Sequence, residues 1–145
     1  MHEQPLIRCL IVDDEPPARD IIKQYIADTP MLQLSGECGN AIQAISFLQH
    51  HTVDLIFLDI RMPQLSGTDF IKTLSHPPKV IFTTAHPEYA LEGYELDVMD
   101  YLLKPIRFDR FLKAVLKAKE YYELRQQNKT ADYTTQQSDF YIKAD

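Results

Sequence analysis

The stretch CLIVDDEPPA, residues 9–18, decides the fold class of this chain of 145 residues. An apolar run passes directly into Asp13, Asp14 and Glu15, and two prolines follow. Strand interiors favour β-branched and aromatic residues and are depleted in Asp. Proline is well tolerated in the first turn of a helix, where its missing N–H costs nothing. The stretch therefore predicts a buried strand that ends in concentrated negative charge and leads into a helix.

The same alternation of apolar run and helical spacing continues along the chain. Apolar runs predict five strands, at about residues 6–12, 31–38, 54–60, 79–84 and 98–103. Helical spacing predicts five helices, at about residues 16–26, 41–48, 70–74, 88–95 and 108–126. Asn40 is expected to cap the second helix. Strands that are apolar on both faces are typical of a parallel sheet covered by helices, so the pattern predicts a doubly wound α/β fold.

Composition and charge narrow the class of protein. The net charge is −6, with 15 basic against 21 acidic residues, which disfavours nucleic acid as the direct partner of this chain. Cys9 and Cys38 lie in apolar runs and are interpreted as small buried hydrophobic residues in a reducing compartment. The first residues show no signal-peptide pattern, and the chain has no long apolar span. A cytoplasmic location is expected.

Polar residues gather where the predicted strands end. In doubly wound sheets, ligands bind outside the carboxyl ends of the strands. The residues at those ends are Asp13 and Asp14 after the first strand, Asp59 after the third, Thr83 and Thr84 at the fourth, and Lys104 with Pro105 after the fifth. We therefore expect the functional site at this edge of the sheet.

These residue types predict a particular chemistry. Crowded carboxylates raise one another's pKa unless a cation neutralises them, and Mg²⁺ is typically held by carboxylates, water and phosphate oxygens. A lysine ammonium and a threonine hydroxyl can stabilise charge on a transferring phosphoryl group. Asp59 is then the candidate nucleophile, which would form an aspartyl phosphate.

Four segments together resemble a known family. IVDDE, LIFLDIRMPQLSG, VIFTTAH and DYLLKP are similar to the four signature blocks of bacterial response-regulator receiver domains, in order, across residues 6–126. The resemblance implies a flavodoxin-like receiver fold with strand order 2-1-3-4-5. It implies that Asp59 accepts a phosphoryl group from a sensor histidine kinase and that Mg²⁺ is the cofactor. Asp14 and Asp59 would ligate the metal directly, Asp13 through water, and Arg61 through its backbone carbonyl.

The resemblance also assigns the residues that respond to phosphorylation. Thr84 matches the switch threonine, Tyr101 the switch aromatic residue and Lys104 the phosphate-binding lysine. Thr83 and Thr84 point to different faces of a strand, so only one of them reaches the site, and the family pattern favours Thr84. The Lys104–Pro105 peptide is expected to be cis. Arg61 and His86 occupy positions that flank the phosphoryl group, and we hypothesise that they tune its lifetime.

A longer segment, VIFTTAHPEYALEGYELDVMDYLLKPI, is similar to receivers that precede a LytTR-type DNA-binding domain. Residues 1–126 are then the receiver, the polar residues 127–139 a linker, and residues 140–145, FYIKAD, the start of a truncated LytTR-like domain. The resemblance implies transcriptional control through the missing domain, contact with DNA only through that domain, and no membrane partner. It also implies a homodimer formed through the fourth helix, fifth strand and fifth helix.

Three other functions were weighed. A phosphatase of the haloacid-dehalogenase kind needs a second Asp two residues after its nucleophile, and Arg61 stands there. A flavin or nucleotide module needs a phosphate-cradling loop after the first strand, where DDEPPA would repel phosphate. A degenerate receiver would have lost part of the acid set, which is intact here. The sequence thus predicts a switch and not an enzyme acting on an external substrate.

Overall fold

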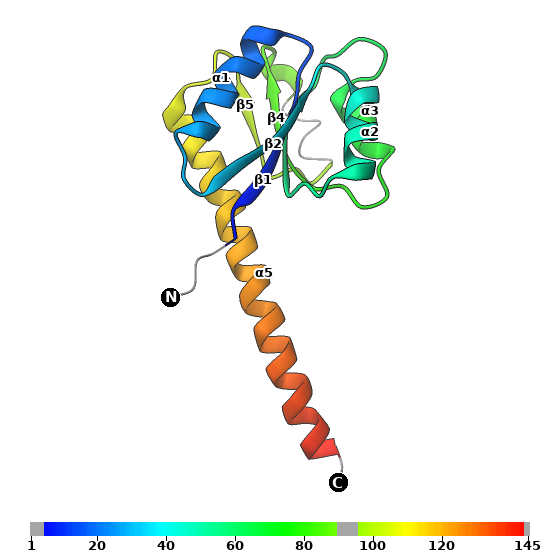
Figure 1. The fold of residues 1–145 in the computed structure, drawn as a ribbon, viewed down its shortest axis with the longest axis vertical. Helices are drawn as coiled ribbons and strands as arrows, with labels where there is room; N and C mark the ends of the chain where they lie inside the picture. The colour runs from blue at the N-terminus through cyan, green and yellow to red at the C-terminus, as the bar shows by residue number, and fades with distance from the viewer. Residues whose placement is uncertain (1–4, 90–95, 144–145) are drawn as a thin grey trace.

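The computed structural model describes residues 5–89 and 96–143, and it contains a single parallel sheet. The strands are β1 (Ile7–Val12), β2 (Leu32–Cys38), β3 (Leu55–Asp59), β4 (Lys79–Thr84) and β5 (Asp100–Leu103). Their order across the sheet is β2-β1-β3-β4-β5, and each neighbouring pair is parallel (Figure 1). The predicted doubly wound sheet and its strand order are confirmed.

Helices cover both faces of the sheet. They are α1 (Pro16–Ala27), α2 (Ala41–His50), α3 (Gly67–Lys72) and α5 (Phe108–Lys143), with a 3-10 turn, η1 (Pro87–Tyr89), after β4. Figure 1 shows α1 and α5 on one face and α2 and α3 on the other. The helix expected at about residues 88–95 coincides at its start with η1, and residues 90–95 lie outside the described part of the chain.

Local chemistry explains where the helices begin. The Asn40 side chain accepts a hydrogen bond from Gln43 N at 2.8 Å, which confirms the predicted cap of α2. The Ser66 hydroxyl caps α3 in the same way, by accepting from Asp69 N at 3.2 Å. Prolines occupy the first turn of α1, where they remove no helical hydrogen bond.

Alternation along the strands divides the core into two clusters. On the α1 and α5 face, Phe57 of β3 stacks on Phe111 of α5 with ring centroids 5.2 Å apart. On the α2 and α3 face, the next residue, Leu58, packs in a cluster with Phe70 and Phe82. Neighbouring residues of one strand therefore serve opposite layers, as expected of a sheet that is buried on both sides.

Both cysteines are buried and free, as predicted. Burial raises the pKa of the Cys9 thiol to about 12, and burial also raises the pKa of Cys38. A thiol held in its protonated form is a poor nucleophile. These cysteines therefore act as small apolar residues of the core.

The last helix is longer than predicted. The expected end near residue 126 is wrong, because α5 continues without a break to Lys143 (Figure 1). Residues 127–139, predicted as a polar linker, are helical, and residues 140–143 are helical where the start of a strand was expected. No Gly or Pro occurs after Pro105, so nothing in the chain interrupts the helix. The division of the chain into domains stays a prediction.

Within the described residues, no helix combines the length and the apolar character that crossing a lipid bilayer would require.

Candidate acidic site at the carboxyl edge of the sheet

Three carboxylates meet at the carboxyl edge of β1 and β3. Val12 of β1 is the register partner of Leu58 of β3, so Asp13 and Asp59 follow side by side. Carboxylate oxygens of Asp13, Asp14 and Asp59 all lie within 4.8 Å of one another. Asp13 is 1% and Asp59 5% exposed, whereas Asp14 is open to solvent. The sequence prediction that these acids come together is confirmed.

Backbone and side-chain donors hold the loop that carries Asp13. Glu15 N donates to Asp13 Oδ1 at 2.9 Å, and Arg19 Nη1 donates to the Asp13 carbonyl oxygen at 2.6 Å. Arg19 Nε also donates to Glu37 at 3.1 Å, which links the loop to β2. Arg19 was not among the site residues predicted from the sequence. Its position indicated a role, because it is a basic residue in the first turn of the helix that follows three consecutive acids.

Lys104 brings one positive charge to the acids. Its Nζ lies 2.8 Å from Asp13 Oδ2 and 3.6 Å from Asp59 Oδ2. Burial alone would lower the pKa of Lys104, but the contacts with Asp13 and Asp59 outweigh it and the net direction is upward. The ammonium therefore stays charged. The Lys104–Pro105 peptide is cis, as expected, and Lys104 N donates to the Thr84 carbonyl oxygen at 2.7 Å.

One ammonium does not offset the charge of the three carboxylates. Burial, followed by the negative charge of Asp13, raises the pKa of Asp59 to about 7. Lys104 and the hydrogen bond from Arg61 N, at 3.3 Å to Asp59 Oδ1, lower that pKa but do not cancel the rise. Near neutral pH the carboxyl group is thus partly protonated, and a further cation would favour its ionised form.

The donor set fits a hard divalent cation. All three side chains offer carboxylate oxygens, which are the ligands that Mg²⁺ prefers. Asp13 Oδ2 is buried and, among the described residues, accepts no well-aligned hydrogen bond, although Lys104 lies close to it. A buried carboxylate oxygen without a full hydrogen bond has capacity for a water molecule or a cation. The residues present therefore suit Mg²⁺.

Gly67 allows the loop after Asp59 to close tightly. A Cβ atom at this position would lie 2.3 Å from the Asp59 carbonyl oxygen, which is far inside contact distance. Gly67 N donates to the Ile60 carbonyl oxygen at 2.7 Å, so α3 begins against the end of β3. Gly67 was not among the residues predicted to matter, although its loop belongs to a segment that resembles the family. The Ser-Gly pair before an apolar helix was the signal for a capped start at close range.

Thr84, Arg61 and His86 form a second group at the same edge of the sheet. Thr84 is 1% exposed, and its hydroxyl accepts a hydrogen bond from His86 N at 3.0 Å. Arg61 Nη1 lies 3.3 Å from His86 Nε2, so the side chains two residues beyond Asp59 and Thr84 meet over the edge of the sheet. The two side chains are therefore in contact, and the predicted effect of Arg61 and His86 on a phosphoryl group stays a prediction.

Tyr101 lies away from the acids. It is half-buried on β5, where it packs against the cluster on the α2 and α3 face, and Phe82 of β4 is its register partner. This placement puts it on the same face as Thr84, two residues beyond Phe82. A role as a switch aromatic residue stays a prediction.

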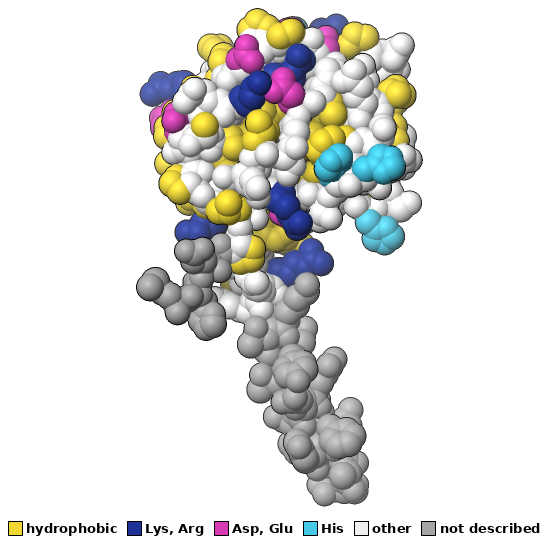
Figure 2. Space-filling view, in the orientation of Figure 1, with side chains coloured by type: hydrophobic (Ala, Val, Ile, Leu, Met, Phe, Trp, Pro, Cys, Tyr) yellow, Lys and Arg dark blue, Asp and Glu magenta, His cyan; other side chains and the backbone are white. Residues whose placement is uncertain are grey.

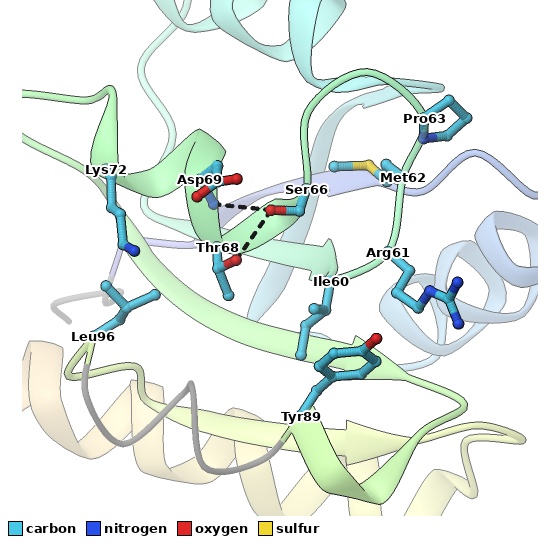
Figure 3. Close-up of a pocket in the computed structure, with 10 residues that line it drawn as sticks. All are labelled: Ile60, Arg61, Met62, Pro63, Ser66, Thr68, Asp69, Lys72, Tyr89 and Leu96. Carbon is cyan, nitrogen blue, oxygen red and sulfur yellow. Dashed lines mark hydrogen bonds between the residues drawn. The ribbon is translucent and has the colours of Figure 1, made fainter.

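A neighbouring pocket of about 840 Å³ opens beside the loop that follows β3 (Figure 3). Its lining includes Arg61, Met62, Lys72, Tyr89 and Leu96. None of the three acids lines it. The pocket is thus adjacent to the acidic site and distinct from it, with Arg61 at the boundary.

A doubly wound sheet of this order, with two acids directly after β1, an acid at the end of β3 and a lysine after β5, defines a receiver domain. The chain belongs to the response regulator receiver domain family, whose sequence profile matches residues 9–116. A receiver is a signalling domain of two-component systems, not an enzyme.

Named relatives and solved structures agree with this assignment. The transcriptional regulatory protein BtsR of Escherichia coli K12 is 38% identical over 117 residues, which cover 79% of this chain and 49% of BtsR. An uncharacterized response regulatory protein of Vibrio cholerae is 34% identical over 131 residues, or 89% of this chain and 53% of that protein. The response regulatory domain of mrkE from Klebsiella pneumoniae superposes with a TM-score of 0.74 at 33% identity, covering 81% of this chain and 98% of that domain.

The chain spans about half the length of the curated relatives that it matches. What those relatives do as whole proteins is therefore not assigned to this chain by similarity to its receiver domain.

Proposed function

We propose that this receiver accepts a phosphoryl group on Asp59 from the phosphohistidine of a sensor histidine kinase, and that the modification changes a surface read by an output domain. The observation that supports the proposal most directly is the position of the Asp59 carboxylate. It lies at the end of a buried strand, beside two further carboxylates, with the Lys104 ammonium 3.6 Å away. An isolated structural acid would need neither the extra acids nor the lysine.

The transfer is a displacement at phosphorus. An Asp59 carboxylate oxygen forms a bond to phosphorus while the bond from phosphorus to the kinase histidine nitrogen breaks. The electron pair of that bond returns to the imidazole nitrogen, and the product is an acyl phosphate on Asp59. Lys104, whose pKa is raised by Asp13 and Asp59, would supply a fixed positive charge beside the new phosphoryl oxygens.

Asp14, Asp59 and the Arg61 backbone carbonyl would hold Mg²⁺ directly, and Asp13 would hold it through water. Magnesium would supply positive charge at the phosphoryl oxygens. The carboxylates position that charge, and Arg19 and the Glu15 amide keep Asp13 in place through the contacts described above.

Thr84 and Tyr101 would carry the change to the surface. Thr84 donates and accepts within its own turn with His86, so drawing its hydroxyl toward a phosphoryl group would break that local contact. Tyr101 lies on the edge strand β5, two residues before the exposed Leu103, and would follow Thr84 inward. A covalent group can bias such an equilibrium because it contacts one arrangement better than the other.

Arg61 and His86 would set the lifetime of the phosphoryl group. Their side chains meet at 3.3 Å above the edge of the sheet, and His86 also lies 3.5 Å from Glu88. Bulky side chains in this place limit the approach of a water molecule to the acyl phosphate. Replacing both residues by Ala should therefore change the rate of dephosphorylation.

The output is transcriptional control. Relatives such as BtsR are named transcriptional regulatory proteins and extend well beyond the matched segment. We propose that this receiver is followed by a LytTR-type DNA-binding domain, that DNA is contacted only there, and that the face formed by the fourth helix, β5 and α5 supports a homodimer. No membrane partner is proposed.

The first test is the mass of the intact protein after incubation with Mg²⁺ and acetyl phosphate. The wild-type chain should gain one phosphoryl group, and Asp59→Ala should gain none. Asp20→Ala is the matched control, because Asp20 is an exposed acid on α1 outside the site, and it should be modified like the wild type. An equal adduct on Asp59→Ala would refute Asp59 as the acceptor.

A further inference from the structure

Thr83 carries a buried hydroxyl that lacks a partner. Its side chain is 0% exposed, and Thr83 Oγ1 makes no hydrogen bond to any residue that the structure describes. Buried hydroxyl groups are nearly always hydrogen-bonded, because burial removes their hydrogen bonds to water and a missing protein partner leaves that free-energy cost uncompensated. The only other buried side-chain oxygen or nitrogen in this condition, among the described residues, is Asp13 Oδ2.

Register places this hydroxyl on the face of the acidic site. Asp59 of β3 is the direct register partner of Thr83, and Thr83 is in turn the partner of Leu102 on β5. Side chains of register partners lie on the same face of a parallel sheet. Leu102 belongs to the core cluster on the α1 and α5 face, so Thr83 faces that side while Thr84 faces the other.

Lys104 shares this face and reaches across it. Lys104 lies two residues after Leu102, at the end of the edge strand β5, and β4 and β3 separate it from β1. Its Nζ is nevertheless 2.8 Å from Oδ2 of Asp13, which directly follows β1, and 3.6 Å from Oδ2 of Asp59, the last residue of β3. The lysine side chain therefore extends over the end of β4, where Thr83 stands.

A shift of the ammonium from Asp13 toward Asp59 would bring it closer to Thr83. Neighbouring strands lie about 4.8 Å apart, and β3 is one strand nearer to β4 than β1 is. A phosphoryl group on Asp59 adds negative charge on the β3 side and attracts the ammonium that way. The ammonium has three N–H donors, and a threonine oxygen can accept one of them.

From this arrangement we infer that Thr83 is a positioning residue for Lys104. Its hydroxyl accepts a hydrogen bond from the Lys104 ammonium when that ammonium leaves Asp13, and so holds the positive charge against the phosphoryl group on Asp59. In this role Thr83 acts through Lys104 and not on the phosphoryl group itself. The inference rests on the proposed phosphorylation of Asp59.

Two variants separate the hydroxyl from the shape of the side chain. Thr83→Val keeps the branched volume and removes the hydroxyl, whereas Thr83→Ser keeps the hydroxyl. Measured by intact mass at early times with acetyl phosphate and Mg²⁺, Thr83→Val should acquire the phosphoryl group about tenfold more slowly than the wild type, and Thr83→Ser within about twofold of it. Thermal unfolding and calorimetric titration with Mg²⁺ should show both variants folded and equal in metal affinity.

A double-mutant cycle with Lys104→Ala tests the route of the effect. If Thr83 acts through Lys104, then Thr83→Val should slow the reaction no further once Lys104 is Ala. The inference is overturned if Thr83→Val reacts like the wild type, if Thr83→Ser is as slow as Thr83→Val, or if the loss persists in the Lys104→Ala background. An equal mass gain on Asp59→Ala overturns the proposed function, and this inference with it.

Discussion

Asp54 and Asp59 stand at the two ends of the same strand, β3, in opposite electrostatic conditions. At the amino end, the Asp54 carboxylate accepts from Arg8 N, Nε and Nη2 at 2.8, 3.0 and 3.2 Å. Its carbonyl oxygen accepts from Lys79 N and from the Tyr122 hydroxyl. Figure 2 shows Lys and Arg side chains near the point where α5 leaves the body. At the carboxyl end, Asp59 shares one lysine with two other acids.

The contrast separates a structural acid from a reactive one. Asp54 forms an ion pair with Arg8, and the hydrogen bonds and charge of Asp54 raise the pKa of Arg8. Asp59 is buried beside like charge, so its own pKa is raised to about 7. Groups whose environment opposes their ordinary ionisation concentrate at functional sites. The ion pair with Arg8 at the amino end of β3 stabilises the fold. At the carboxyl end, burial and the charge of Asp13 oppose ionisation of Asp59 more strongly than Lys104 favours it.

The largest change in the free energy of unfolding is expected from a substitution in the loop that packs against the Asp59 backbone. In Gly67→Ala, the new Cβ would lie 2.3 Å from the Asp59 carbonyl oxygen, so the chain must move apart there. We expect a loss of about 2–4 kcal/mol in the free energy of unfolding, measured by urea denaturation. Phosphorylation should also slow, since the shift displaces the end of β3.

Gly39→Ala is the matched control for that substitution. A Cβ at Gly39 would meet its nearest side-chain atoms at 3.7 Å, which is ordinary contact. Its free energy of unfolding should stay within about 0.5 kcal/mol of the wild type. Equal losses in the two variants would show that the close approach at Gly67 has no special importance.

A smaller effect, of opposite sign, is expected for Asp59→Asn. The folded-state pKa of Asp59, about 7, lies above its ordinary value, so between about pH 4 and pH 7 the folded chain binds more protons than the unfolded chain. Asp59 therefore reduces stability as the pH rises through this window. Asn removes that penalty, and we expect a gain on the order of 2 kcal/mol at pH 7 in the absence of divalent cations.

The difference between wild type and Asp59→Asn should shrink toward pH 4, where both side chains are neutral in the folded chain. Measuring the difference cancels Glu37 and Asp100, whose lowered pKa values give the opposite trend with pH. Saturating Mg²⁺ should also reduce it, because a bound cation stabilises the ionised wild-type carboxylate. A destabilised Asp59→Asn at pH 7 without metal would contradict the comparison.

The sequence was sufficient to predict the sheet and the residues at its edge, because both depend on local patterns. Apolar runs mark buried strands, and acids directly after them must lie where parallel strands end. What it lacked was register. Alternation showed that Thr83 and Thr84 face opposite sides, but only the pairing of Thr83 with Asp59 reveals that the unpartnered hydroxyl shares the acid's face.

The misses also have physical causes. The predicted end of the last helix near residue 126 was wrong because residues 127–143, although polar, contain no Gly or Pro that would stop a helix. Gly67 was overlooked because its importance comes from a backbone atom of β3 that lies close in space. Arg19 was overlooked because its partner is a carbonyl oxygen, which no side-chain pattern reports.

The smallest expected effect belongs to the paired end of β3. Asp54→Asn removes the charge but keeps an oxygen that can accept from Arg8 N, and the two side chains are 21% and 45% exposed. Ion pairs in such partly solvated positions contribute little, so the loss in the free energy of unfolding should be about 0.5–1 kcal/mol. Urea denaturation should show the loss shrinking further at about 1 M salt, because salt screens exposed charges.

Arg8→Met, made in the wild type and in Asp54→Asn, gives the coupling energy between the two residues. A coupling of several kcal/mol, or one that salt leaves unchanged, would show that the Arg8–Asp54 ion pair is shielded from solvent as a buried charge is. The contrast between the two ends of β3 would then fail.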